Sequence, residues 1–182
     1  MKKSRFGGKV INKMQLKLPA LSANEGMARA AVAAFCAQLD PAAVEIADVK
    51  CAVSEAVTNA IVHAYKGRNG EDKILIECAG ETTDGYGGVL HIKITDFGCG
   101  IENVEQALKP FFTTLAGDER SGMGFTIMES FMTAFEVNSA PGKGTTVHMR
   151  RKLQKRQRQR LRSLLRLSSL STVCLLHPRI CS

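Results

Sequence analysis

Three polar residues, Glu55, Asn59 and His63, recur at intervals of four within the segment 49–65. In a helix this spacing places them on one face, one turn above another. The rest of the segment is apolar almost all round, which is typical of a buried helix. A carboxylate and a carboxamide on such a helix need polar partners, because an unpaired buried polar group costs free energy. Mg²⁺ bound with phosphates would supply them; the alternative is that Glu55 and Asn59 lie on an exposed stripe.

A further carboxylate, Asp96, follows the alternating run 90–95 (LHIKIT) and precedes Gly98 and Gly100. The alternation predicts a strand that ends at Asp96. Glycines at this point can adopt positive φ or let a ligand approach the backbone. Asp96 can then accept a hydrogen bond from an exocyclic amine such as that of adenine. Taken alone, the same pattern is also typical of an ordinary turn.

A third group, Arg120, Gly122 and Gly124, directly precedes the periodic run 125–135, which predicts a helix with a Met and Phe core face. The free N–H groups and the dipole at a helix N-terminus attract anions. Arg120 can offer a planar pair of donors to a terminal phosphate. The sequence contains no Walker motif, so this would be a phosphate site of another kind.

These residues together make the chain similar to the GHKL ATP-binding superfamily, and within it to the small stand-alone serine kinases that act as anti-sigma factors in sporulation. The similarity spans about residues 14–149 and is carried by 32–41 (VAAFCAQLDP), 53–65 (VSEAVTNAIVHAY) and 119–132 (ERSGMGFTIMESFM). The resemblance implies ATP and Mg²⁺ as cofactors. It also implies a homodimer that sequesters a sporulation sigma factor and phosphorylates its anti-anti-sigma antagonist on serine.

The resemblance further implies a role for each matching residue. Glu55 would be the general base that deprotonates the seryl hydroxyl, and Arg120 would contact the γ-phosphate. Asn59 would bind Mg²⁺, and Asp96 would bind the adenine amine. The remaining nucleotide-binding residues would be glycines and threonines, namely Gly98, Gly100, Thr113, Thr114, Gly122, Gly124 and Thr145.

Two further features follow from the resemblance. Residues 101–121 would form a mobile lid over ATP, in which many relatives carry a lysine where this chain has Leu115. Arg120 would then hold the terminal phosphate with less help, or Lys109 would assist. The sigma factor would dock around the first helix, where Glu25 and Arg29 match.

The length and the element pattern predict one domain over 14–150. The expected strands are 14–18, 73–79, 89–95, 134–139 and 144–150, the expected helices are 24–38, 42–65 and 122–133, and a lid covers 98–121. Several strands follow one another without a helix, which indicates a mixed sheet with helices on one face. This α/β (α+β) two-layer sandwich is also the GHKL, or Bergerat-type, fold that the resemblance implies. Residues 1–13 are expected to be a disordered extension.

Cysteine spacing and hydropathy indicate whether the protein binds zinc and in which cellular compartment it is found. The six cysteines show no paired C-x₂-C spacing and the four histidines lie far from them, so no zinc site is predicted. With no signal peptide and no apolar stretch near 18 residues, we expect a cytoplasmic protein that does not bind membranes.

The net charge of +8 is concentrated at the C-terminus. Residues 150–182 hold 10 Lys and Arg and no acidic residue, whereas 1–149 carry a net charge of −2. Arg, Leu and Ser, which have six codons each, supply 21 of these 33 residues. Translation in a wrong reading frame would produce this composition. We therefore predict that 151–182 is a basic tail, disordered or frame-shifted, without direct nucleic-acid binding; an evolved basic arm is the alternative.

Three functions remain in competition. The first is the serine kinase and anti-sigma factor, the second is a non-catalytic ATP-gated binding module, and the third is nucleic-acid binding through the basic tail. The presence of both Glu55 and Asn59 favours catalysis, because adenine recognition alone does not need a base.

Overall fold

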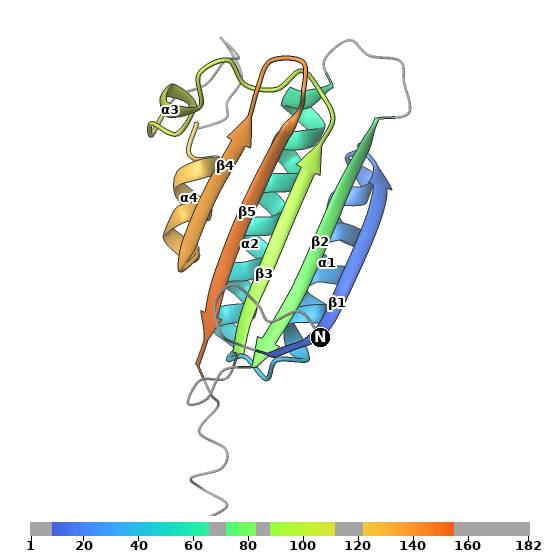
Figure 1. Ribbon diagram of the computed structural model, residues 1–182, viewed down its shortest axis with the longest axis vertical. Coiled ribbons are helices and arrows are strands. Elements are labelled where there is room, and N and C mark those ends of the chain that lie inside the picture. Colours follow the sequence, from blue (N-terminus) through green and yellow to red (C-terminus); the bar gives the residue numbers. More distant parts are fainter. Residues whose placement is uncertain (1–8, 66–71, 83–87, 112–121, 155–182) are drawn as a thin grey trace, which may run out of the picture.

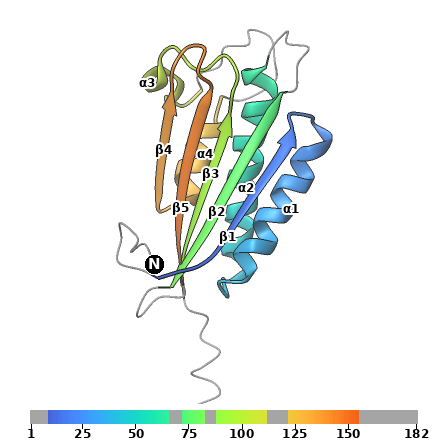
Figure 2. The same ribbon diagram turned by 45° about the vertical axis from the view of Figure 1, so that its right-hand side comes forward.

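The computed structural model describes residues 9–65, 72–82, 88–111 and 122–154. Within these residues, five strands form one sheet in the order β1-β2-β3-β5-β4. The strands are β1 (Lys9–Pro19), β2 (Lys73–Thr82), β3 (Gly88–Asp96), β4 (Ala134–Ser139) and β5 (Thr145–Leu153). Helices α1 (Ala23–Ala37), α2 (Ala43–Asn59) and α4 (Gly124–Phe131) lie against one face of the sheet (Figures 1 and 2). The predicted two-layer sandwich is confirmed.

The direction of the strands differs from the expectation of a mixed sheet. Each neighbouring pair, β1 with β2, β2 with β3, β3 with β5 and β5 with β4, is antiparallel. The prediction rested on strands that follow one another without a helix, and that order does not fix the direction in which each strand enters the sheet. Here the hairpin from β4 inserts β5 between β3 and β4, so that β5 runs antiparallel to both of its neighbours.

The sheet also begins earlier than expected. We expected residues 1–13 to be disordered, but β1 starts at Lys9, which pairs with Thr82 of β2. The side chains of 9–13 are mostly exposed and show no apolar alternation. They belong to an edge strand that is held by backbone pairing with β2, which leaves no signal in the side-chain pattern.

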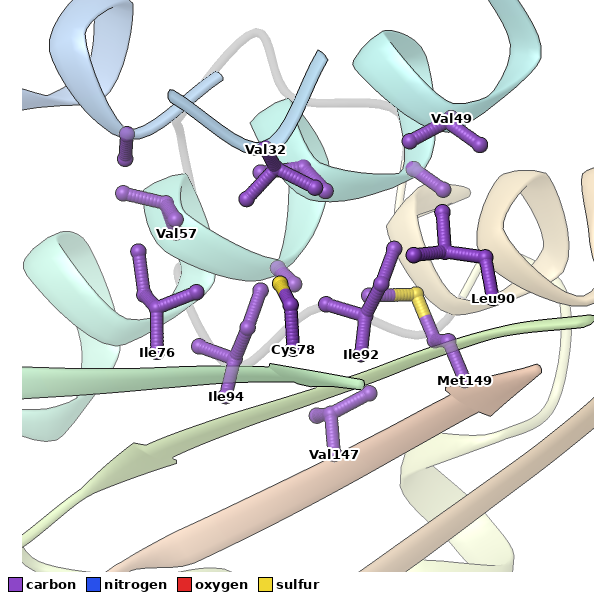
Figure 3. Packing of buried hydrophobic residues seen from close by; sticks show 14 of the residues in the cluster. Val32, Val49, Val57, Ile76, Cys78, Leu90, Ile92, Ile94, Val147 and Met149 are labelled. Carbon is purple, nitrogen blue, oxygen red and sulfur yellow. The ribbon is translucent and has the colours of Figure 1, made fainter. Parts of the chain in front are cut away.

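The hydrophobic core fills the space between the sheet and the helices. In Figure 3, Val32, Val49 and Val57 of the helices lie on the opposite side of the core from Ile92 and Met149 of the strands. All five side chains are at most 1% exposed. Burial of each such side chain stabilises the fold by about 1.5–3 kcal/mol. The predicted helix over 125–135 is confirmed only in part: Met128 is fully buried and Phe125 packs against the core, but α4 ends at Phe131, and Phe135 reaches the core from β4.

Helix α2 does not continue as a regular α-helix to residue 65. Its last turn, η1 (Ala60–Ala64), is π-helical, a form that is rare and often marks functional sites. At the end of this turn the Ala64 carbonyl accepts a hydrogen bond from the Cys99 N–H at 2.8 Å. This contact joins the helix to the turn that follows β3.

Strand β5 continues past the predicted boundary at residue 150. Leu153 is fully buried, and Arg151 forms an ion pair with Asp48 of α2 at 2.7 Å. The Gln154 N–H donates to Glu45 Oε1 at 3.0 Å. The folded domain therefore extends at least to Gln154.

Candidate functional site

A cavity of about 760 Å³ lies between the C-terminal half of α2, the short helix α3 (Val104–Ala107), the start of α4 and the ends of β3 and β5. Most of the predicted site residues within the described ranges line it, namely Glu55, Asn59, Asp96, Gly100, Gly122, Gly124 and Thr145. These residues lie far apart in the sequence. The fold brings four separate segments to one hollow.

Glu55 and Asn59 meet the N-terminus of α4. A Cβ atom placed on Gly124 would lie 3.0 Å from Glu55 Oε2 and 3.2 Å from Asn59 Nδ2. The glycine therefore permits a close approach between the polar face of α2 and the first turn of α4. Backbone N–H groups of this turn have no partner within their own helix and favour negative charge. A carboxylate, a carboxamide and an anion-binding helix end thus share one wall of the cavity.

Asp96 lines the same cavity and is only 6% exposed. Its Oδ1 accepts hydrogen bonds from the N–H groups of Gly98 and Thr145, each at 3.0 Å. Burial raises the pKa of this carboxyl, and the two backbone hydrogen bonds partly offset that rise. Both of these hydrogen bonds fall on Oδ1, which leaves Oδ2 as an acceptor for a ligand donor.

Glycines hold the turn after β3 against its neighbours. Gly100 has φ of 72°, and a Cβ atom on it would lie 2.0 Å from the Ala140 carbonyl oxygen. Gly98 was predicted to bind the nucleotide, but it lies outside the cavity lining, and a Cβ atom there would lie 2.1 Å from the Ala64 carbonyl oxygen. Gly98 therefore serves the packing of the turn.

Gly144 does not line the cavity but positions residues that do, and sequence reasoning missed it. Its φ is 76°, and a Cβ atom on it would lie 2.2 Å from the carbonyl oxygen of Asp96. The glycine lets the β4–β5 turn approach the backbone of Asp96, and so lets the next residue, Thr145, bond the Asp96 carboxylate. The paired glycines of 142–145 (GKGT) were a signal that could have identified it.

Ser139 connects the same turn to Ile101, the first residue of the segment predicted to form a lid. Its Oγ accepts from the Ile101 N–H at 2.9 Å and donates to the Gly144 carbonyl at 2.9 Å. It also lies 2.9 Å from Thr145 Oγ1. Thr145 is thereby fixed at the rim of the cavity.

The cavity is also lined by apolar side chains of the sheet and by amide side chains near α3. Ile94 and Val147 of the sheet contribute apolar surface, and Asn103 and Gln106 contribute amides from the region of α3. Sequence reasoning did not select these four residues. The strand alternation placed Ile94 in the core, and no spacing rule linked α3 to α2.

The other predicted residues either fall outside the described residues or do not line the cavity. Thr113, Thr114, Leu115 and Arg120 fall outside the described residues. Lys109 is exposed and does not line the cavity. The two residues predicted to contact a sigma factor, Glu25 and Arg29, form an ion pair at 3.6 Å on α1, a helix that contributes nothing to the lining.

The described residues contain no group of three or more His, Cys, Asp and Glu side chains arranged to hold a metal ion. Mg²⁺ does not require such a group, because it commonly binds through one or two protein oxygens together with phosphates and water. The oxygen atoms of Glu55 and Asn59 beside an anion-binding helix end fit that manner of binding. None of the helices in the described ranges is both long and apolar enough to cross a lipid bilayer.

Comparison with known proteins agrees with this geometry. The family described as the histidine kinase-like ATPase domain matches residues 18–151. An anti-sigma F factor from Caldanaerobacter subterraneus is 51% identical over 138 residues, which cover 76% of this chain and 92% of that protein. The anti-sigma F factor of Clostridium acetobutylicum is 50% identical over 142 residues, covering 78% and 94%.

A solved structure shows the same fold at low sequence identity. The RsbU and RsbW domains of a Mycobacterium tuberculosis protein match with a TM-score of 0.55 and 19% identity, over 80% of this chain and 34% of that chain. The family match, the relatives at half identity and the shared fold lead to one conclusion: this chain belongs to the histidine kinase-like (GHKL) ATPase family, and within it to the anti-sigma F factors.

Proposed function

We propose that this chain is an ATP-dependent protein serine kinase and anti-sigma factor, which sequesters a sporulation sigma factor and phosphorylates an anti-anti-sigma protein on serine. One observation carries the proposal: Glu55 and Asn59 meet the N-terminus of α4 in the cavity that Asp96 also lines. The names of the relatives support the anti-sigma role. A base beside the phosphate-binding helix end supports the kinase activity.

The cavity offers a place for each part of ATP. Asp96 would accept a hydrogen bond from the adenine amine through Oδ2, with Ile94 and Val147 against the base. The phosphates would lie at the start of α4, where Gly122 and Gly124 line the cavity. Gly100 and Thr145 would border the nucleotide. From the sequence, Thr113, Thr114 and Arg120 are proposed to complete the site over the γ-phosphate.

The carboxamide oxygen of Asn59 would hold Mg²⁺ together with the phosphates. When bound, the ion neutralises phosphate charge and so favours attack by an oxygen nucleophile. The protein contributes the position of Asn59 on α2 and the short distance to the first turn of α4.

Glu55 would act as the general base. Its carboxylate accepts the proton of the substrate serine hydroxyl, the serine oxygen bonds to the γ-phosphorus, and the bond from that phosphorus to the β–γ bridging oxygen breaks. The products are phosphoserine and ADP. Such transfer depends mainly on positioning and charge neutralisation, which a small set of residues can supply.

The partners would be held on other surfaces. The sigma factor would contact α1 near Glu25 and Arg29, and the active form would be a cytoplasmic homodimer. Glu25 and Arg29 lie on a helix outside the cavity lining, so sigma binding and nucleotide binding would use separate residues.

The decisive experiment is phosphoryl transfer. The chain is incubated with γ-labelled ATP, Mg²⁺ and an anti-anti-sigma protein from a spore-forming relative, and the labelled residue is mapped. Label on a serine of that protein is the expected result. Tight ATP binding without transfer would contradict the kinase and support an ATP-gated binding module instead.

A further inference from the structure

Tyr65 follows the π-helical turn at the end of α2 and is outside the cavity lining. Its side chain is buried, with the whole residue 8% exposed. The hydroxyl accepts a hydrogen bond from the Phe97 N–H at 2.8 Å and donates one to the Lys73 carbonyl. One oxygen atom therefore joins the end of α2 to the start of β2 and to the residue next to Asp96.

The neighbouring backbone strengthens this connection. The Ala64 carbonyl accepts from Cys99 N–H at 2.8 Å and lies against Gly98, where it leaves no room for a Cβ atom. The three residues that follow Asp96 are thus fixed by two consecutive residues of the α2 terminus. On the other side, Gly142 N–H donates to the Cys99 carbonyl at 2.6 Å.

Asp96 depends on this turn for its own orientation. The Gly98 N–H is one of two donors that hold Asp96 Oδ1, and Gly98 lies one residue beyond the amide that Tyr65 binds. A shift of the 97–99 backbone would move the Gly98 N–H and leave the carboxylate held by the Thr145 N–H alone. Burial raises the pKa of the Tyr65 hydroxyl, so it remains protonated at neutral pH and keeps its donor for Lys73.

We infer that Tyr65 is a positioning residue for base recognition: through Phe97 and the turn 97–99, its hydroxyl fixes the orientation in which the Asp96 carboxylate meets the nucleotide base. This inference rests on the proposed ATP site. Tyr65 touches no substrate atom. Its hydroxyl sets the choice of base, and the γ-phosphate end of the cavity is served by other residues.

The first test is independent of ATP. In Tyr65→Phe the Phe97 amide loses its acceptor, so its hydrogen exchange should accelerate about tenfold or more, while amides of α1 keep their wild-type rates. Unchanged exchange at Phe97 would overturn the inference, whatever the fate of the proposed kinase.

The second test measures base choice. Calorimetry should show ATP affinity of Tyr65→Phe reduced about tenfold and the ATP:GTP preference reduced by a similar factor, with turnover at saturating ATP within about twofold of the wild type. Val32→Ala, a cavity-forming change in α1, is the control for lost stability and should retain the wild-type base preference. An unchanged ATP:GTP ratio in Tyr65→Phe would overturn the inference.

A second variant approaches the same contact from the turn. Gly98→Ala places a Cβ atom against the Ala64 carbonyl and should also reduce both ATP affinity and base preference. It keeps the inference testable if Tyr65→Phe does not fold, and wild-type base choice in folded Gly98→Ala would contradict it. If the wild-type chain binds no ATP, the proposed function fails and the inference falls with it.

Discussion

Glu55 and Asp96 are both carboxylates of one cavity, but their surroundings suit different tasks. Asp96 is buried, and two backbone N–H groups hold its Oδ1 in place. A fixed acceptor of this kind can distinguish one hydrogen-bond donor from another. Glu55 is partly exposed and ends beside the first turn of α4. This position suits a group that takes a proton from an incoming hydroxyl.

The first prediction concerns Glu55→Gln. The amide keeps the shape of the side chain but cannot take up a proton, so phosphorylation should fall by about 10²-fold or more, the scale of a lost general base. ATP affinity, measured by calorimetry, should stay within a few fold of the wild type. Wild-type turnover in this variant would remove Glu55 from the mechanism.

The second prediction concerns Asp96→Asn. The variant should bind ATP and GTP more alike in calorimetry, because the carboxamide offers a donor where Oδ2 accepts. Asn59→Ala is the matched comparison at another residue of the cavity lining. It should weaken the Mg²⁺ dependence of ATP binding and leave the base preference unchanged. If Asn59→Ala instead changed the base preference and Asp96→Asn changed the Mg²⁺ dependence, the roles assigned to these two residues would be wrong.

The third prediction concerns stability and pH at the same position. Burial raises the folded-state pKa of Asp96, so its contribution to stability is largest at low pH and is lost as the pH rises through that pKa. At neutral pH the nucleotide-free Asp96→Asn variant should therefore melt at a higher temperature than the wild type. The difference should shrink as the pH falls toward about 4, near the ordinary pKa of an aspartate. A constant difference across this range would contradict the assignment.

At the scale of elements, the N-terminus of α4 and the polar face of α2 are fitted to one another through Gly124. Alanine at this position would favour the helix by up to about 1 kcal/mol. Its Cβ atom, however, would lie 3.0 Å from Glu55 Oε2 and 3.2 Å from Asn59 Nδ2. Both atoms lie at the ends of flexible side chains. The two side chains can therefore move aside without unfolding the protein, but they then leave the positions that the proposed reaction requires.

The fourth prediction follows from that conflict. Gly124→Ala should keep or slightly raise the melting temperature and at the same time reduce phosphoryl transfer by about tenfold or more, since the displaced groups are the proposed base and metal ligand. Thermal melts and the labelled-ATP assay on one preparation measure both. A parallel loss of stability and activity would show that the glycine matters only for folding.

The elements themselves differ in how far the sequence predicts them. Glu55 and Asn59 could be placed together because residues four positions apart lie on the same face of a helix, and this depends only on the local sequence. The π-helical turn η1 and the start of β1 at Lys9 were not predictable, since the first leaves the apolar pattern unchanged and the second depends on backbone pairing with β2.

The glycines of the site show the same limit. Gly98 and Gly100 lie in the same turn after Asp96, and the sequence does not distinguish their roles. In the structure only Gly100 lines the cavity, whereas Gly98 packs against Ala64. Which of them faces a ligand depends on the end of α2, more than thirty residues away in the chain. The paired glycines of 142–145 indicate a tight turn, but only the fold shows that Gly144 lies against the backbone of Asp96.

At the scale of the whole molecule, the end of β5 closes the domain against the start of α2. Arg151 pairs with Asp48 at 2.7 Å and also donates to the Phe131 carbonyl. Gln154 N–H reaches Glu45, and Leu153 is fully buried. The basic composition that begins at residue 150 therefore includes residues that belong to the fold.

The fifth prediction separates those residues from the rest of the basic segment. Deletion of 155–182 leaves every one of these contacts in place, so melting temperature, ATP binding and phosphoryl transfer should equal those of the full chain. Deletion of 151–182 removes Leu153 and leaves Asp48 without its partner. It should destabilise the domain by at least the roughly 2–5 kcal/mol that is typical of truncating one buried leucine, as measured by denaturant unfolding.

The same two deletions decide whether the basic segment binds nucleic acid. An arm that contacts phosphates would bind nonspecific duplex DNA with an affinity that falls by about one log unit per log unit of salt for each phosphate contacted. We expect weak binding that is the same for the full chain and for the chain ending at residue 154, because the proposed activity resides in the cavity between α2 and α4. Tight, salt-sensitive binding that disappears with residues 155–182 would instead establish a nucleic-acid function. That result would leave the proposed ATP site untouched, since none of the described residues that line it lies beyond Val147.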